Sequence, residues 1–191
     1  YTYMYTHPGK KLNFMGNELG EYKEWDERKA LAWNILEYPQ HDSFHHFMQD
    51  LNKMVEEHPA LYSMDYDPKG FKWLVVDDHN QSVFSYARFD KKGNCLVVVA
   101  NFIGNSHDNY AVPVPFAGSY KEILNTEKDS YNGSNYTNTR ALRSKKGTCL
   151  NEAQSIHVKL APFSAVVFEY HKPAKKASSK KTKKSVVKEG K

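Results

Sequence analysis

The residues that could take part in chemistry lie near the start of the sequence. Asn17 and Glu18 directly follow the apolar residues 14–16, and Trp25 lies a few positions further on. Parallel barrels present their reactive groups in this way, because their catalytic side chains sit at the C-terminal ends of strands. Amide and carboxylate side chains also orient hydroxyl groups by hydrogen bonds. We therefore expect a buried strand over residues 12–17 whose polar end faces a binding site.

The sequence around these residues resembles a known family. A Pro-Gly turn at residues 8 and 9 leads into an apolar segment that ends in Gly-x-Glu at residues 16–18. This arrangement is similar to the eighth strand of the alpha-amylase superfamily, glycoside hydrolase family 13, and most similar to bacterial glycogen branching enzymes. The resemblance continues in the same order to residue 171, through Asp65-Tyr66-Asp67-Pro68, Gly70-Phe71, Trp73-Leu74, Asp77-Asp78, Ala100-Asn101-Phe102, residues 121–126 and residues 131–135.

The resemblance implies three parts. Residues 1–60 would be the end of a catalytic (β/α)8 barrel, namely its last strand and helix, and residues 61–171 an all-β antiparallel C-terminal sandwich of the alpha-amylase type. Residues 172–191 would be a disordered basic tail. A complete barrel takes roughly 250 residues, so 191 residues cannot hold one beside a second domain. We interpret the chain as the C-terminal part of a larger enzyme; the alternative is a complete small protein with a chance Met-Gly-Asn-Glu string.

Hydrophobic periodicity supports this division. Between residues 43 and 58 apolar side chains recur at a spacing of three and four, which predicts an amphipathic helix. Asp42 or Ser43 would cap the helix, Pro59 would end it, and its stripe would pack on the strand at residues 12–17. From residue 62 short β segments separated by turns follow. We expect strands over residues 71–77, 83–89, 95–102, 110–116, 120–124, 155–160 and 164–170.

Two of these segments carry positional information. Residues 96–100 are continuously apolar, which is typical of a central strand buried on both faces. Pro113 and Pro115 have no N–H to donate, so their segment belongs at the edge of a sheet. About 100 residues of this kind make one antiparallel sandwich.

The positive charge of the chain is confined to its tail. Residues 172–191 hold nine of the 27 basic residues and carry +8, which leaves −3 for the remainder. The tail is too poor in apolar residues to offset the entropy of ordering, so we expect it to be disordered and solvated. Polyanion binding is the alternative. We expect no nucleic-acid binding other than electrostatic attraction to the Lys-rich tail, since the tail has no aromatic residue on which a base could stack.

Cysteine usage and hydropathy narrow the class of protein further. Cys95 and Cys149 show neither metal-ligand spacing nor a disulfide framework, so we expect reduced thiols, no metal site and a cytoplasmic location. No apolar run approaches the roughly 20 residues of a membrane span, so we expect no membrane contact. No Gly-rich phosphate loop is present, and we expect no cofactor.

The resemblance implies the activity of a 1,4-alpha-glucan branching enzyme. Such an enzyme cleaves an α-1,4 glucan, holds the fragment covalently and transfers it to a 6-hydroxyl, which creates the α-1,6 branches of glycogen. This retaining chemistry uses a carboxylate nucleophile and a carboxylic acid/base about 5 Å apart. We expect glycogen or amylose as the partner and a monomer for the full-length form.

We assign no catalytic residue to this chain. The family places its nucleophile, its acid/base and a third Asp after strands four, five and seven, and these positions would precede residue 1. His41-Asp42 and His107-Asp108 imitate the His-Asp pair of the seventh strand, but both follow the eighth. We assign the first pair to a helix entrance and the second to a surface loop, and we expect the chain alone to be inactive.

Asn17, Glu18 and Trp25 remain as candidates for substrate binding. Asn17 and Glu18 would orient substrate-contacting groups by hydrogen bonds, and Trp25 would offer an apolar face to a sugar ring. For Glu18 the alternative is a structural carboxylate bonded to barrel backbone, and for Trp25 and Trp33 packing in the core or between domains is preferred. Two other functions stay open, a stand-alone glucan-binding β module and a polyanion-binding protein acting through the Lys-rich tail.

Overall fold

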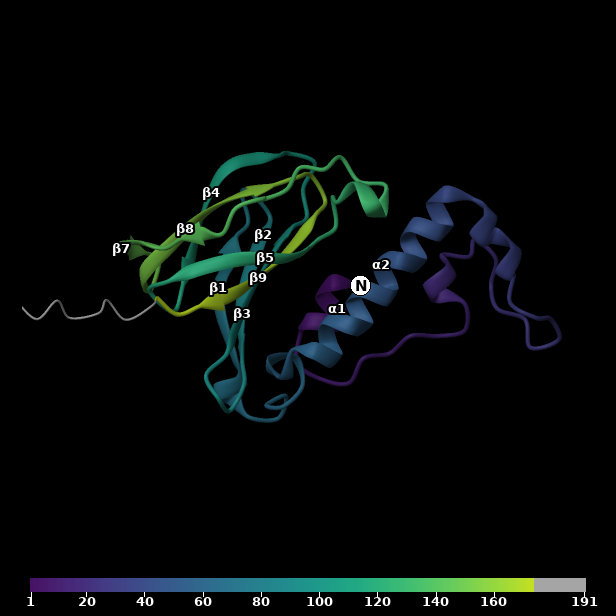
Figure 1. Ribbon diagram of the computed structural model, residues 1–191, viewed down its shortest axis with the longest axis horizontal. Helices are drawn as coiled ribbons and strands as arrows, with labels where there is room; N and C mark the ends of the chain where they lie inside the picture. The colour runs from purple at the N-terminus through teal and green to yellow at the C-terminus, as the bar shows by residue number, and fades with distance from the viewer. Residues whose placement is uncertain (174–191) are drawn as a thin grey trace, which may run out of the picture.

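Two antiparallel sheets form a sandwich in the computed structural model, which describes residues 1–173 (Figure 1). The six-stranded sheet has the order β1 (Phe71–Asp78), β2 (Val83–Phe89), β3 (Cys95–Asn101), β9 (Ala165–His171), β5 (Ser119–Asn125), β6 (Leu142–Arg143). The three-stranded sheet has the order β4 (His107–Val114), β8 (Glu152–Leu160), β7 (Lys145–Cys149). The predicted antiparallel sandwich is therefore confirmed. The disorder predicted for the tail concerns mostly residues 174–191, which lie outside the described residues.

The core of the sandwich lies between the inner faces of the two sheets. It includes Val97 and Val99 of β3, Val112 of β4, Ile156 of β8 and Phe168 of β9, all of which are buried. β3 pairs with β2 on one side and β9 on the other, which confirms the central position predicted for residues 96–100. β4, which contains Pro113, is an edge strand, as predicted.

Two helices cover the outer face of the six-stranded sheet. α1 (Thr2–Thr6) and α2 (Pro39–Glu57) lie beside β3 and β9 (Figure 1). The stripe predicted for the second helix is buried in one cluster with residues of the sheet, and its members include Phe47, Met48, Leu51, Met54, Tyr86, Leu96, Val98, Leu124 and Val167. This layer explains why β3 is apolar on both faces.

The position and the start of this helix differ from the prediction. The stripe of α2 packs on the six-stranded sheet and not on residues 12–17. The helix begins at Pro39, with Tyr38 as its N-cap, so neither Asp42 nor Ser43 caps it. Proline is favoured at the first helical position because its φ is already helical and its missing N–H would have no partner there.

The strand predicted over residues 12–17 is not formed by this chain. Residues 11–14 have no regular structure, and the 3-10 helix η1 (Asn17–Leu19) follows. A strand requires a hydrogen-bonded neighbour, and no strand of the described residues pairs with this segment. Leu12, Phe14 and Met15 are consequently exposed. Further 3-10 turns are η2 (Trp33–Glu37), η3 (Pro59–Leu61), η4 (Pro68–Gly70) and η5 (Asp129–Tyr131).

The strands that the prediction missed or shortened are polar in sequence. β6 and β7 lie in a stretch rich in Lys and Arg that lacks the β-branched alternation of a typical strand. β4 begins at His107 and not at residue 110, so His107-Asp108 belongs to a strand and not to a surface loop. His41-Asp42 lies in the first turns of α2, where it was predicted.

Arg88 of β2 joins the N-terminal segments to the sandwich. Its side chain is 0% exposed, and it donates from Nη1 to the carbonyl oxygen of Thr6 (2.6 Å) and from Nε to that of Gly70 (3.3 Å). Nη2 pairs with the carboxylate of Asp65. A buried guanidinium requires such partners, because removing an unpaired charge from water is very costly. Arg88 thereby fixes both α1 and the connection before β1 to the sheet.

The two cysteines are expected to differ strongly in reactivity. Cys95 is buried, and this burial raises the pKa of its thiol to about 12. Cys149 is half-buried, and burial raises its pKa less. Because the thiolate is the reactive form, alkylation at pH 8 should modify Cys149 in the native protein and Cys95 only after unfolding. Peptide mass spectrometry would measure this, and equally fast modification of both native thiols would contradict the described burial.

Candidate functional site

The three candidate residues lie in the segment that precedes α2. This segment, purple to dark blue in Figure 1, lies on the side of α2 away from the sandwich. Two hydrogen bonds attach η1 to the helix, from Nδ1 of His41 to the carbonyl of Leu19 (2.8 Å) and from Nδ1 of His45 to that of Glu18 (3.3 Å). Leu19 is completely buried. The segment therefore has a fixed position although it contains no strand.

A surface hollow of about 340 Å³ lies in this segment. Its lining consists of Phe14, Met15, Gly16, Asn17, Glu21, Lys23, Glu24 and Trp25. Asn17 and Trp25 thus face one space, as expected of residues that contact one ligand. The combination of aromatic rings with amide and carboxylate groups suits a polyhydroxylated ligand, which has both apolar C–H faces and hydroxyl groups.

Two glycines set the backbone at the base of the hollow. Gly16 and Gly20 flank η1 with φ of +83° and +66°, in the left-handed region that glycine adopts without strain. A Cβ atom at Gly16 would also lie 3.2 Å from Cδ2 of Leu31 and 3.3 Å from Cδ of Glu21. A larger residue at position 16 would therefore push residues 21 and 31 away from the turn that presents Asn17.

Glu18 does not line the hollow. Its Oε2 accepts a hydrogen bond from Nδ2 of Asn13 (2.8 Å), which ties the turn to the preceding residues. Two roles were considered for Glu18, one in orienting substrate and one as a structural carboxylate. The hydrogen bond with Asn13 agrees better with the structural role, although the partner is a side-chain amide and not barrel backbone. Asn17, by contrast, is exposed at the hollow and available to a ligand.

Trp25 is 41% exposed and leans on Phe14. The two rings meet edge to face, with centroids 5.3 Å apart and an interplanar angle of 81°. Such a contact holds an indole in place. Trp33 is exposed as well and does not line the hollow. The sequence favoured packing for both tryptophans. Trp25 shows this only in part, through its contact with Phe14, and Trp33 is exposed.

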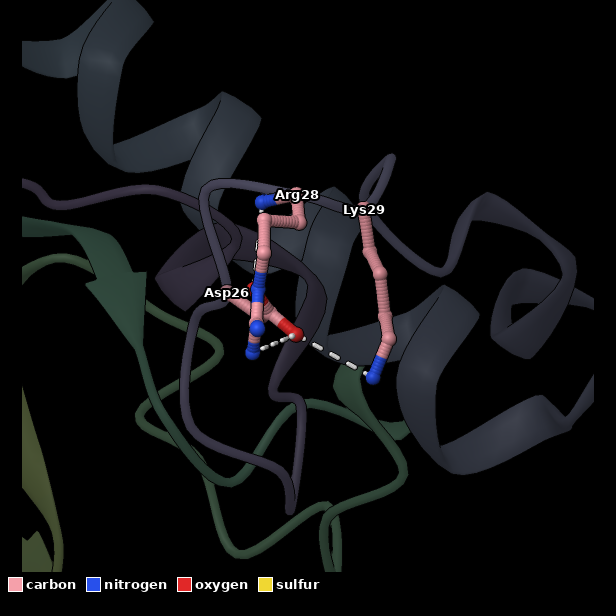
Figure 2. A network of polar contacts seen from close by, with 3 residues as sticks. All are labelled: Asp26, Arg28 and Lys29. Carbon is pink, nitrogen blue, oxygen red and sulfur yellow. Dashed lines mark hydrogen bonds and ion pairs between the residues drawn. The ribbon is translucent and has the colours of Figure 1, made fainter.

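The acidic loop after Trp25 is held by internal contacts. Asp26 accepts hydrogen bonds from the backbone N (3.1 Å) and Nε (3.0 Å) of Arg28 and pairs with Nζ of Lys29 (3.1 Å), as Figure 2 shows. These contacts, those of Arg28 first, lower the pKa of Asp26. Oε1 of Glu21 accepts from the backbone N of Ala32 (2.7 Å) and closes the loop. These hydrogen bonds and ion pairs hold the loop together.

Sequence reasoning missed part of the lining. Phe14 and Met15 were assigned to a buried strand, Glu24 was expected in a solvated acidic loop, and Lys23 was not singled out. One feature of the sequence could have indicated these residues: they lie in the same twelve-residue stretch as Asn17 and Trp25. Among residues 1–173, no cluster of His, Cys, Asp and Glu is placed to hold a metal ion. Within the same residues, no helix has both the length and the hydrophobicity needed to cross a membrane.

Comparison with known proteins decides the family. Residues 73–171 match the family described as "Alpha amylase, C-terminal all-beta domain". The chain belongs to this family. Its alpha-amylase C-terminal domain comprises all nine strands except the first two residues of β1. A solved alpha-amylase from H. orenii has a similar fold over 89% of this chain and 34% of its own, with a TM-score of 0.51 and 14% identity.

The likeness to curated proteins extends beyond the alpha-amylase C-terminal domain. A 1,4-alpha-glucan branching enzyme GlgB from Pseudomonas fluorescens (strain Pf0-1) is 40% identical over 168 residues, which cover 88% of this chain and 23% of that protein. GlgB from Oceanobacillus iheyensis is 40% identical over 170 residues, 88% of this chain and 27% of that protein. The resemblance to bacterial branching enzymes is confirmed. The chain spans about a quarter of the length of these relatives.

Proposed function

We propose that this chain is the C-terminal part of a 1,4-alpha-glucan branching enzyme. One observation carries the proposal: the likeness to GlgB proteins spans 168 residues, whereas the family match begins at residue 73. A match of 168 among 191 residues must include residues 24–168, so the likeness covers Trp25 and α2 and not only a sandwich that many glucan enzymes share. In this proposal residues 1–60 complete the catalytic domain, and residues 61–171 form the domain that supports it.

The chemistry of the proposed enzyme takes place on residues outside this chain. A carboxylate attacks the anomeric carbon of an α-1,4 glucan while a carboxylic acid protonates the leaving oxygen, and the 6-hydroxyl of a second glucan then displaces the enzyme. Asn17 and Trp25 contribute a wall of the glucan site, and Glu18 holds the turn that carries Asn17. The proposed enzyme requires no cofactor, and we propose that it acts as a cytoplasmic monomer on glycogen or amylose.

Trp25 provides a direct test of the proposed wall. In the full-length protein, Trp25→Ala is expected to raise KM for amylose about tenfold and to leave kcat nearly unchanged, because it removes an apolar contact made before and during the reaction. The matched control is Trp33→Ala, which removes an exposed indole outside the hollow. Equal effects of the two substitutions on KM would contradict a specific role for Trp25.

The overall function is tested by incubating the full-length protein with linear amylose. Branch formation shortens the linear runs, so iodine staining should fall while the number of reducing ends stays constant. A parallel rise in reducing ends would indicate a hydrolase, and the assignment would move to a related glucan enzyme. The 191-residue chain by itself is expected to leave amylose unchanged.

A further inference from the structure

A second and larger hollow lies on the sandwich, away from the candidate site. Its volume is about 940 Å³, and it lies where β1 and β4, the open edges of the two sheets, meet. The lining comes from β1 and the turn after it, from β4 with the residue before it, and from the end of β7 with the residue after it: Val75, Asp77, Asp78, Gln81, Ser106, His107, Asp108, Asn109, Tyr110, Ala111, Cys149 and Leu150. We call this hollow the β1–β4 seam.

The lining of the seam suits hydroxyl groups. It contains three carboxylates, two amides, two hydroxyls and an imidazole, and neither lysine nor arginine. Phosphates, nucleotides and acidic polymers would be repelled by this charge. Sugar hydroxyls both donate and accept, so carboxylate and amide groups can hold them in pairs. Val75, Ala111 and Leu150 add the apolar surface that the C–H faces of a sugar require.

The polar groups of the seam are held in place before any ligand arrives. Oδ2 of Asp78 accepts from the hydroxyl of Tyr110 (2.6 Å) and from Nε2 of Gln81 (3.0 Å), a bond network that joins the two sheets. Asp108 is bonded by the hydroxyl of Tyr136. A ligand therefore meets oriented carboxylates and does not have to order them, which favours binding.

Other polar groups in the seam lack partners. The side chains of Asp77 and Asn109 are exposed and make no hydrogen bond to any residue that the structure describes. Nε2 of His107 is buried and likewise unbonded within residues 1–173. Buried polar atoms are nearly always hydrogen-bonded in native proteins, so this nitrogen needs a partner that the described residues do not supply.

We infer that the β1–β4 seam is a second binding site for α-1,4-glucan, separate from the site that contains Asn17 and Trp25. The inference rests on the proposed function for the choice of glucan among polyhydroxylated ligands. Such a site would hold one part of a long glucan on the sandwich while another part reaches the catalytic domain. It would raise the local concentration of substrate without taking part in the chemistry.

Cys149 supplies a reporter for occupation of the seam, because it is a half-buried thiol in the lining. In the full-length protein, saturating maltoheptaose should slow the alkylation of Cys149 at least about fivefold, since a bound ligand covers the thiol. Peptide mass spectrometry would identify the modified residue, and an α-1,6-linked dextran of equal mass is the matched control sugar. An unchanged rate with maltoheptaose, or equal protection by dextran, would overturn the inference.

The double variant Asp77→Ala/Asn109→Ala tests the binding groups themselves. Both side chains are exposed and bond to no other described residue, so the thermal unfolding midpoint should not change. Because two hydrogen-bonding groups are lost, the maltoheptaose concentration that half-protects Cys149 should rise about tenfold or more. The control is Glu56→Gln, an exposed carboxylate on α2 outside the seam. Undiminished protection in the double variant would overturn the site.

The protection of Cys149 and the formation of branches test two different proposals. Branch formation together with an unprotected Cys149 would refute the second site and leave the proposed function standing. Protection of Cys149 without branch formation would refute the proposed function and keep a glucan-binding sandwich, which is the β-module alternative. Protection by heparin in place of maltoheptaose would refute glucan as the ligand.

Discussion

Replacing Arg88 by alanine is expected to lower the free energy of unfolding by about 3–5 kcal/mol, the cost of breaking a buried ion pair. Arg88 is completely buried, and the change leaves Asp65 and the carbonyl oxygens of Thr6 and Gly70 without their donor. It also frees α1 and the connection before β1 from the sheet. Urea unfolding followed by circular dichroism would measure the loss.

Arg28→Ala is the matched control for Arg88. Arg28 also pairs with an aspartate, Asp26, but its side chain is 80% exposed (Figure 2). An exposed pair of this kind contributes little to stability because solvent screens it, so Arg28→Ala should change the free energy of unfolding far less than Arg88→Ala. If the two substitutions changed the free energy of unfolding equally, Arg88 would not be the buried junction described here. Asp65→Asn should destabilise in the same direction as Arg88→Ala, because it leaves the guanidinium charge unpaired.

Leu51→Ala is expected to destabilise the protein by about 2–5 kcal/mol, the usual cost of removing a buried leucine side chain. Leu51 is 0% exposed and lies in the cluster between α2 and the six-stranded sheet. The variant thus probes the contact by which the sheet holds the segment containing Asn17 and Trp25. Urea unfolding at several wavelengths would show whether this segment separates from the sandwich.

The neighbouring residue provides the control for Leu51. Asn52 is exposed on the same turn of α2, and Asn52→Ala should change the free energy of unfolding by no more than about 0.5 kcal/mol. A loss for Leu51→Ala as small as that for Asn52→Ala would mean that α2 does not cover the sheet in solution. The strand predicted at residues 12–17 would then be the better partner for its stripe.

Local patterns of sequence predicted much of this fold. The continuous apolar run at residues 96–100 placed β3 at the centre, and Pro113 placed β4 at an edge, because both arguments need only the chemistry of the strand itself. The strand expected at residues 12–17 is not formed by this chain, since pairing depends on neighbours that a local pattern does not contain. Arg88 was unpredictable for the same reason, as its partner Thr6 lies 82 positions away.

The two proposed sites also show how far local sequence patterns can predict a site. Asn17 and Trp25 could be associated from sequence because they lie within one short segment and line one hollow. The β1–β4 seam draws its lining from three separated segments, so no spacing in the sequence indicated it. His107 was noticed only as an imitation of a catalytic motif, and its place in the lining of the seam became visible once β4 was placed against β1.

The most direct test of the proposed function is the linkage of the product made by the full-length protein from linear amylose. Proton NMR separates α-1,4 from α-1,6 anomeric signals, so each transferred chain can be counted. We predict that α-1,6 signals appear in step with the loss of α-1,4 signals and that total glucan is conserved. A product with α-1,4 linkages only, whether shortened or rearranged, would contradict the assignment of this chain to a branching enzyme.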